Sequence, residues 1–401
     1  MTSDNNDSSY EISSHSTGSH RANSRQERMR KHTQNSYRSL GDAPPASGLG
    51  TLSNPTKPPR KIDQRLTTKR MVTAGLLLPL FMLIFLPLTL TGTLDDVHPR
   101  HMDVAIIGSE TDVQKQTDDL DHQTAGSFDV HRVDNVDDAK NQINERQVRA
   151  AYNPAEGKLY LAGANGKQVN SAVTQLFTPV AQQSHQEMQT EDIQPVHEED
   201  PSGTSAVYLA LGAILGGFMS GMILGLLPVD SKLRLILGVA MPVIIATAEI
   251  IIGWAVFGIF DGSAMGTWGI LYLLSFSCLA VTLGGMLAIG PAIMLPISIF
   301  LTSLLGMATS GVTAPLDMVH AFYAGIHPWL FSSQGIEAVK NSIYFQDMSF
   351  AQPIWVMLIW AVVGIVLAVF GTVRQKRRHL FATMSEMEEA QFMMAVGAVA
   401  P

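Results

Sequence analysis

Residues 206–227, AVYLALGAILGGFMSGMILGLL, decide how this chain folds. The stretch contains no charged residue, and a helix needs about 20 apolar residues to cross the hydrocarbon core of a bilayer. In lipid, apolar surface alone does not hold helices together, whereas small residues allow their backbones to approach closely. We therefore predict a membrane helix with a packing face; the alternative is a lipid-facing helix that is simply rich in glycine. Its glycines are Gly212, Gly216, Gly217, Gly221 and Gly225.

The composition of the whole chain also indicates a membrane protein. Of its 401 residues, 46% are hydrophobic and only 15% are charged, whereas soluble domains are about one quarter charged. The apolar residues gather in blocks long enough for membrane helices. We expect an α-helical polytopic membrane protein with six transmembrane helices, at residues 71–92, 206–227, 235–260, 267–288, 292–310 and 353–373.

The charges that flank the first block predict the orientation of the chain. Residues 1–70 carry twelve Lys or Arg and six Asp or Glu, whereas residues 93–204 carry eight and twenty. Lys and Arg near the ends of spans collect on the cytoplasmic side. We therefore expect a multi-pass protein of the cell (plasma) membrane with both termini in the cytoplasm. By composition, residues 1–70 are a disordered basic tail, and residues 374–401 are a second cytoplasmic tail.

Residues 93–204 are predicted to form a small extracytoplasmic α/β domain and a linker between the first two spans. Their apolar patterns indicate strands at residues 103–108, 128–133, 148–152 and 158–162. Helical patterns lie between or after these strands, at residues 112–122, 136–146 and 167–187. The expected order is β-α-β-α-β-β-α, followed by an acidic linker with two prolines at residues 189–203.

Glu249 is the one acid within an apolar span, in the sequence MPVIIATAEIIIGWAVFGIF. An ionisable group at membrane depth is costly, which makes Glu249 a candidate for a substrate or proton pathway. The alternative is a carboxyl group that is hydrogen-bonded to hydroxyls of a neighbouring helix. The candidate hydroxyls are those of Ser275, Ser277 and Thr282.

Two prolines and one short loop complete the candidate residues of the membrane part. Proline bends a membrane helix, so we expect Pro242 and Pro296 to widen a cavity beside the pathway. The inner loop at residues 228–234 is the best contact for an ATPase, although it is short for a coupling helix. Its charged residues are Asp230, Lys232 and Arg234.

The sequence contains no pattern that predicts catalysis or cofactor binding. A Walker A motif is absent, because the nearest string, GANGK at residues 163–167, has the wrong spacing. No nucleophile elbow, HExxH motif or clustered zinc ligands are present. The single cysteine, Cys278, excludes a disulfide framework within the chain. We predict no enzyme activity, no cofactor, no metal site and no nucleic-acid partner.

The outer segment at residues 311–352 carries the most specific signal. Ser310 and Gly311 precede Pro315, a short apolar helical pattern follows, and His-Pro-Trp at residues 327–329 interrupts it. A second amphipathic helix is predicted at residues 335–344. Two short outer helices after a fifth span resemble the type-2 ABC exporter permeases. One span, an outer domain that opens on DVAIIG, and five clustered spans resemble the phage-infection-protein (Pip/YhgE-like) branch of that superfamily.

The resemblance covers residues 71–373 and implies a function. It implies a permease-like component of an ABC-type export system for a lipid, drug or envelope substrate. Such a protein works as a homodimer or heterodimer in the lipid bilayer and needs a separate ATP-binding subunit. The alternative is a non-transporting cell-envelope scaffold or receptor, of the phage-receptor or secretion-accessory type, that acts through its extracytoplasmic domain.

Overall fold

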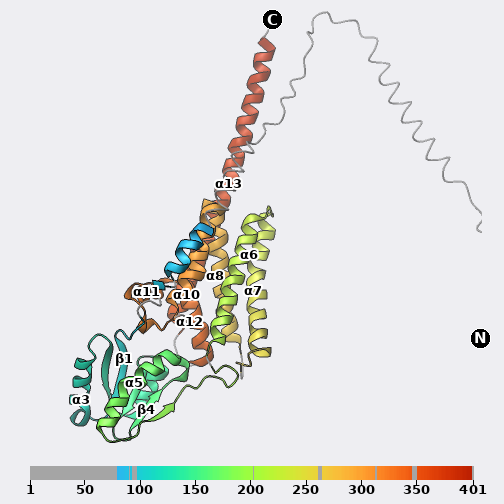
Figure 1. Cartoon of the computed structure of the whole chain (residues 1–401). Coiled ribbons are helices and arrows are strands. Elements are labelled where there is room, and N and C mark those ends of the chain that lie inside the picture. Colours follow the sequence, from blue (N-terminus) through green and yellow to red (C-terminus); the bar gives the residue numbers. More distant parts are fainter. Residues whose placement is uncertain are drawn as a thin grey trace, which may run out of the picture. The chain divides into compact units, whose positions relative to one another are not determined.

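The computed structural model describes residues 79–89, 91–92, 97–201, 203–260, 264–311, 314–345 and 350–399. The chain divides into two compact units, Met1–Ile62 and Asp63–Pro401, and every described residue belongs to the second. The predicted basic tail at residues 1–70 and the first part of the predicted first span lie outside the described residues. Within the second unit, Figure 1 shows a small sheet with its helices and a set of long helices.

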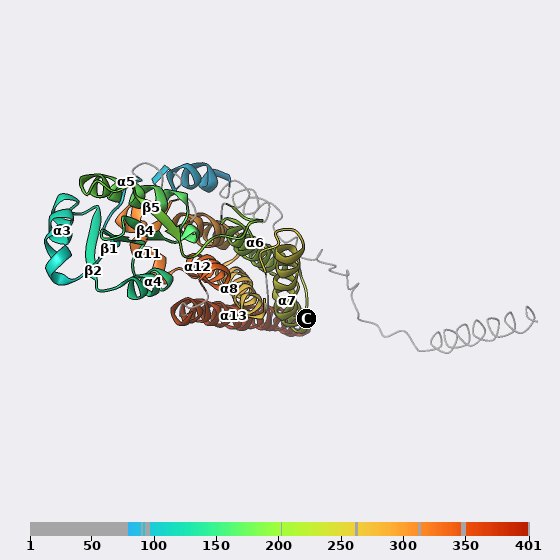
Figure 2. The same cartoon turned by 90° about the horizontal axis from the view of Figure 1, so that it is seen from below.

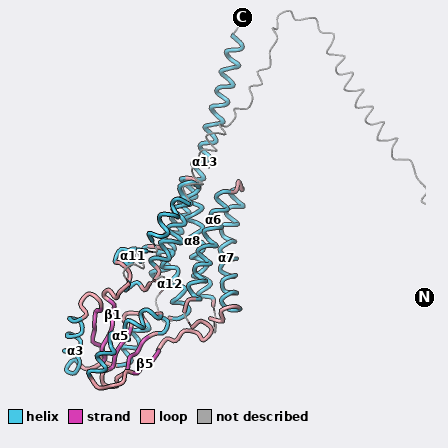
Figure 3. The backbone as a smooth tube through the Cα atoms, viewed as in Figure 1, coloured by secondary structure: helices cyan, strands magenta, loops and turns pink. Residues whose placement is uncertain are grey.

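A five-stranded sheet forms the centre of the α/β domain, and Figure 3 shows its strands as one magenta group. The strands are β1 (Met102–Ile107), β2 (Phe128–Val133), β3 (Ala150–Asn153), β4 (Lys158–Leu161) and β5 (Gln189–Asp192). Their spatial order is β2-β1-β3-β4-β5. β1 pairs in parallel with β2 and β3, β3 and β4 are antiparallel, and β4 and β5 are parallel. The predicted small α/β sheet is therefore confirmed.

Helices cover both faces of this sheet, because successive side chains of a strand point to opposite faces. Helices α3 (Glu110–Gln123) and α5 (Lys167–Gln183) pack with one face, which contributes Val104 and Ile106 of β1. Helix α4 (Val136–Asn144) packs with the other face, beside Ala105 and Ile107. The Asn135 side chain caps α4, because its Oδ1 accepts a bond of 2.8 Å from the Asp138 amide.

Strand β5 lies within the stretch that the sequence pattern assigns to the linker. Its residues are Gln-Thr-Glu-Asp and its side chains are mostly exposed, so it lacks the apolar alternation that marks a strand. The Glu191 carboxylate instead pairs with Lys140 of α4 at 2.7 Å and with Lys158 of β4 at 2.5 Å. Backbone pairing and charge neutralisation explain why this polar edge strand forms.

Five described helices are long and apolar enough to cross a membrane. They are α6 (Ser205–Leu226), α7 (Ser231–Ala255), α8 (Met265–Ile289), the composite helix Pro291–Thr309 and the first part of α13, Ala351–Arg377. The first predicted span is described only in part, as an apolar helix at Pro79–Thr89. These five helices agree in length and composition with the predicted membrane-protein character, whereas a sixth span stays a prediction.

Helix α8 is the central element of this bundle. It packs against α6, α7, α13 and α12 (Phe331–Tyr344), as Figure 2 shows from below. The most apolar window of α8 is 83% buried, whereas the corresponding windows of α7 and α13 are 17% and 22% buried. Helices α7 and α13 therefore present most of their apolar surface outward, as expected for helices that contact lipid.

The composite helix contains a local irregularity, a π-helical turn, beyond the α-helical part that holds its proline. It consists of α9 (Pro291–Ile299), a π-helical turn (Phe300–Leu304) and α10 (Leu305–Thr309). Pro296 lies inside α9, where it lacks the N–H that an α-helix requires. The Ser332 hydroxyl donates a bond of 2.9 Å to the Leu301 carbonyl in the π-helical turn. A neighbouring side chain thus satisfies a backbone group where the regular helix is interrupted.

The predicted outer segment, between the composite helix and α13, folds into short helices. They are a 3-10 turn at Leu316–Met318, α11 (Ala321–Ile326), a 3-10 turn at His327–Trp329 and α12. The predicted break at His-Pro-Trp is therefore a tight helical turn rather than an open loop. α12 begins at Phe331, four residues before its predicted start, and most of its residues are buried. This burial makes α12 a structural part of the bundle.

Helix α13 continues as one helix from Ala351 to Val399. The predicted last span ended at residue 373, and residues 374–401 were expected to form a tail. Helical residues rise about 1.5 Å each, so the 49 residues of α13 extend well past the thickness of a bilayer core. The basic cluster that begins at Arg374 therefore does not end the helix.

Candidate functional site at the junction of the sheet and the helices

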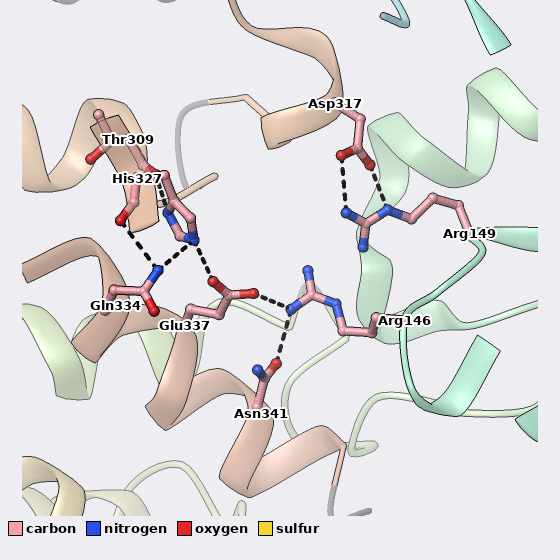
Figure 4. Close-up of polar contacts among 8 residues, drawn as sticks. All are labelled: Arg146, Arg149, Thr309, Asp317, His327, Gln334, Glu337 and Asn341. Atoms are coloured by element: carbon pink, nitrogen blue, oxygen red, sulfur yellow. Dashed lines mark hydrogen bonds and ion pairs between the residues drawn. The ribbon is translucent and has the colours of Figure 1, made fainter. Parts of the chain in front are cut away.

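A polar network joins the α/β domain to the outer segment, and Figure 4 shows its members. We call it the junction network. Two arginines of the α/β domain lie near its centre, and the other members come from α10, the outer 3-10 turns and α12. The members are Arg146, Arg149, Thr309, Asp317, His327, Gln334, Glu337 and Asn341.

Arg146 leaves the end of α4 in an unusual backbone conformation. Its φ is +57°, a region that residues other than glycine seldom occupy, and which often marks a functional constraint. Its Nη1 donates to Glu337 Oε1 and to Asn341 Oδ1, both at 2.9 Å. Glu337 and Asn341 lie one helical turn apart on α12, so a single guanidinium spans that turn. The Arg146 side chain also lies over the Phe345 ring, at 5.3 Å from its centre.

Arg149 makes the second contact between the same two parts. Its Nε and Nη2 donate to the two carboxylate oxygens of Asp317, at 2.5 and 3.1 Å. This two-pronged geometry is the strong form of an arginine–carboxylate pair. Burial opposes the charge of Arg149, but the Asp317 carboxylate outweighs this effect, and the pKa of Arg149 is raised. The Asp317 carbonyl also accepts a bond of 2.7 Å from the Arg100 amide.

His327 links the arginine contacts to the end of α10. Its Nδ1 donates to the Thr309 carbonyl at 2.7 Å, and its Nε2 lies 2.5 Å from Glu337 Oε2. The Nδ1 nitrogen carries a proton in this arrangement, because a carbonyl oxygen can only accept a hydrogen bond. The Gln334 side chain also contacts Nε2, at 2.8 Å.

The surroundings of Glu337 strongly favour its ionised form. Burial would raise the pKa of this carboxyl group, but the hydrogen bond from His327 and the charge of Arg146 act in the opposite direction. The result is a pKa of about 2 for Glu337. Removing one partner of such a buried pair leaves the other charge uncompensated, which costs about 3–5 kcal/mol. The junction network is therefore a strong attachment between the α/β domain and α12.

Apolar packing continues across the same junction. Ala105 and Ile143 from the α4 face of the sheet belong to one hydrophobic cluster with Leu209 of α6 and Phe345 at the end of α12. The α/β domain and the membrane helices therefore share a core in addition to the ionic contacts. This shared packing is a second attachment between α12 and the sheet, beside the ionic contacts.

The candidate Glu249 lies against α6. A side chain at Gly212 would collide with the Glu249 carboxylate, so this glycine provides the space that the carboxylate occupies. Pro242, on the same helix as Glu249, is buried, and α7 continues through it without interruption. The structure therefore places Gly212 and Glu249 together, while Pro296 belongs to another helix.

The hydroxyl groups considered as partners of Glu249 are engaged elsewhere or unpaired. Ser275 Oγ donates to the Tyr272 carbonyl at 3.0 Å, and Ser277 Oγ donates to the Met357 carbonyl at 2.9 Å. Thr282 Oγ1 is buried and has no hydrogen-bond partner among the described residues. Within the described part of the chain, none of these hydroxyls hydrogen-bonds to Glu249. The alternative interpretation, a carboxyl group held by hydroxyls of a neighbouring helix, is therefore not supported at these three residues.

The glycines of α6 divide between two neighbouring helices. A Cβ at Gly217 would collide with the Ser275 carbonyl of α8, and one at Gly221 would lie 2.8 Å from the Leu279 carbonyl. At Gly225 the nearest atom would be the Met286 sulfur, also at 2.8 Å. Gly216 faces α7 instead, where a Cβ would lie 3.1 Å from Ile245.

The residues of the predicted inner loop lie mostly in a helix. α7 begins at Ser231, with Asp230 at its N-cap position, so Lys232 and Arg234 belong to its first turn. The expectation of a loop at residues 228–234 is therefore wrong in its extent. Arg234 Nη2 donates to the Leu227 carbonyl at 3.3 Å, which satisfies a carbonyl at the end of α6.

Sequence reasoning did not identify the junction network. The available signal was the rarity of charge in residues 311–352, which contain only Asp317, Glu337, Lys340 and Asp347. A charged residue in a mostly apolar segment requires a partner. No local pattern shows, however, that the partners of Asp317 and Glu337 are arginines more than 160 residues earlier in the chain.

Neither the contacts nor the comparisons with known proteins indicate a chemical activity. In the described ranges, no group of three or more His, Cys, Asp or Glu could hold a metal ion. The ionised groups of the junction network are paired with one another, which suits attachment better than catalysis. Comparisons of the chain with family models, curated proteins and solved structures found no match.

Proposed function

We propose that this protein is a permease-like membrane component of an ABC-type export system, in which the outer α/β domain moves together with the membrane helices. The observation that carries the proposal is the junction network. Arg146 and Arg149 attach the α/β domain to Glu337 of α12 and to Asp317. Because α12 packs against α6, α8 and α13, a rearrangement of the spans displaces the outer domain.

The proposed substrate is a lipid, drug or envelope precursor, and the energy comes from a separate ATP-binding subunit. In this proposal the chain lies in the cell membrane as a homodimer or heterodimer, with both termini in the cytoplasm. Glu249 lines the substrate pathway beside Gly212, and Pro242 and Pro296 shape it. Lys232 and Arg234 in the first turn of α7 contact the ATPase from the cytoplasmic side.

Purification from native membranes tests this proposal. The tagged full chain is extracted in a mild detergent, and copurifying ATPase activity is measured for the wild type and for Glu249→Gln. We expect an ATP-binding subunit in both samples and a lower turnover with Glu249→Gln. Thr247→Val, on the same helix, is the matched control and should behave as the wild type does. A clean preparation that contains no ATP-binding subunit would contradict the proposal.

A second candidate function rests on the inner connections between the spans. Only residues 227–230 separate α6 from α7, and Gly290 alone separates α8 from α9. These short connections offer an ATPase little surface, which favours an envelope scaffold or receptor that acts through its outer domain. Deletion of residues 103–190 would then abolish function while Glu249→Gln leaves it intact. The opposite pattern would favour export.

A further inference from the structure

A small polar cavity lies beside the junction network. It has a volume of about 50 Å³ and is lined by residues of the α/β domain, α6, α12 and the loop after α10. A buried water needs about 10–15 Å³ of such space, so the cavity has room for about three to five waters or for one small oxyanion. Ser310, Gly311 and Pro315, the residues of the outer-segment motif, form part of its wall.

Positive charge dominates this cavity. Arg146, Arg149 and Lys340 all line it, and Glu337 is the only carboxylate in its wall. Asp317 neutralises Arg149 from outside the wall, and Glu337 is shared between Arg146 and His327. Two paired carboxylates therefore balance only two of the three cations that line the cavity, which leaves one positive charge in excess.

Lys340 is the cation beside the cavity that has no carboxylate partner in the junction network. Its ammonium group makes no hydrogen bond or ion pair with any residue in the described part of the chain. Arg146 Nε is likewise buried without a hydrogen-bond partner there. Buried donors that lack partners are rare in folded proteins, because each carries a desolvation cost. Arg146 Nε is such a donor, and half-buried Lys340 lines the same cavity, so one acceptor inside the cavity would serve both groups.

We propose that the junction cavity binds one tetrahedral oxyanion, of the phosphate or sulfate type, between Lys340 and Arg146. A negatively charged acceptor supplies what both donors lack, and charge-assisted hydrogen bonds of this kind are the strong ones. The same chemical group occurs in free phosphate and in the headgroup of an anionic lipid. The proposal is independent of export, because it rests only on the wall of the cavity and its charges.

The ionisation of Lys340 agrees with this assignment. Burial and the neighbouring charges of Arg146 and Arg149 lower the pKa of Lys340 to about 7, although Glu337 partly offsets them. An anion beside the ammonium group favours its charged form, so binding is coupled to uptake of a proton. Asp317 and His327 also face the network, but their partners are already in place. Anion affinity should therefore fall as the pH rises above 7.

Titration with inorganic sulfate tests the proposal, because sulfate keeps the same charge between pH 6 and pH 9. The full chain is purified in an uncharged detergent, and sulfate binding is measured by calorimetry at constant ionic strength, with chloride as the replaced salt. We expect one site per chain, with an affinity that falls by at most about tenfold per pH unit above pH 7. Absence of sulfate binding, together with a negative result in the lipid experiment below, would overturn the proposal.

The decisive variant is Lys340→Met, which keeps a long apolar side chain and removes the charge. Sulfate affinity should fall about tenfold or more, because a charge-assisted bond is lost. Lys340→Arg should retain binding, and Lys232→Met, which removes an exposed lysine of α7, should leave it unchanged. Unfolding temperatures show whether each variant is folded. Equal affinities for the wild type and a folded Lys340→Met variant would overturn the assignment.

Nanodiscs distinguish the two sources of the anion. The unfolding temperature is compared between discs of phosphatidylcholine and discs that contain phosphatidylglycerol. A rise with phosphatidylglycerol in the wild type, absent in Lys340→Met, supports the site and makes a lipid headgroup its ligand. Sulfate binding without a lipid effect supports the site and makes its ligand a soluble anion.

Discussion

The α6–α8 contact and the junction network hold the same molecule together by opposite means. At the first, backbones approach so closely that Gly217 has no room for a Cβ beside the Ser275 carbonyl. At the second, Arg146 and Glu337 bring buried charges together across 191 positions of sequence. The α6–α8 contact has no space for an added side-chain atom at Gly217. The junction network is destabilised when either member of the Arg146–Glu337 pair is removed. Each contact therefore fails under a different kind of substitution.

The largest expected effect is that of Gly217→Leu. A side chain there must displace the α8 backbone itself, because the Cβ would collide with a main-chain carbonyl. We therefore expect a cost above the ~1–3 kcal/mol that is usual for overpacking and above the ~3–5 kcal/mol lost when a buried ion pair is broken. We expect loss of folded protein on size-exclusion chromatography and a strongly lowered midpoint in SDS-induced unfolding. Gly269→Leu in α8 is the matched control, because a Cβ at Gly269 meets no atom within 4 Å. Equal unfolding midpoints for the two variants would show that α6 and α8 do not pack as described.

Asp317→Asn is expected to have the next largest effect. The substitution keeps the shape of the side chain and leaves the buried Arg149 guanidinium without its counter-charge. The expected destabilisation is about 3–5 kcal/mol, measured as the shift in the SDS unfolding midpoint. Asp118→Asn, on the exposed side of α3, serves as the control and should leave the midpoint unchanged. A small effect at Asp317 would mean that the Arg149 contact is solvated.

The pH dependence of stability sharpens the account of Glu337. Its pKa of about 2 in the folded protein lies below the ordinary value of about 4.3. A lowered pKa of this kind stabilises the folded state above pH 4.5 and loses that contribution as the pH falls toward 2, by about 3 kcal/mol in all. Stability of the wild type should therefore fall more steeply in this window than that of Glu337→Gln. If stability changed with pH in the same way in the wild type and in Glu337→Gln, the claim that Glu337 is ionised in the folded protein would be contradicted.

The smallest expected effect is that of Ser332→Ala. The Ser332 hydroxyl satisfies the Leu301 carbonyl in the π-helical turn, and an unsatisfied buried carbonyl costs about 1–3 kcal/mol. A destabilisation near the lower end of that range is expected, because a carbonyl oxygen has two lone pairs and can accept a hydrogen bond from another donor. Ser342→Ala, which removes a bond of α12 to its own backbone and to Thr267, provides a comparison within the same helix.

The sequence predicts the apolar helices better than it predicts the site. The five described spans follow from uncharged stretches such as residues 206–227, because the need to bury backbone groups in lipid acts locally. Strand β5 escapes prediction, since Glu191 is held by lysines of α4 and β4 that are distant in sequence. The junction network is not predicted for the same reason, because Arg146 and Glu337 meet only after the α/β domain and α12 have folded.

The proposal that the outer domain is attached through ion pairs is tested most directly by a double-mutant cycle on Arg146 and Glu337. The free energy of unfolding is measured for the wild type, Arg146→Met, Glu337→Gln and the double variant. Residues in contact show coupling energies of about 0.5–3 kcal/mol, and we predict a favourable coupling of about 2 kcal/mol or more for this buried pair. Additive effects of the two substitutions would contradict the attachment.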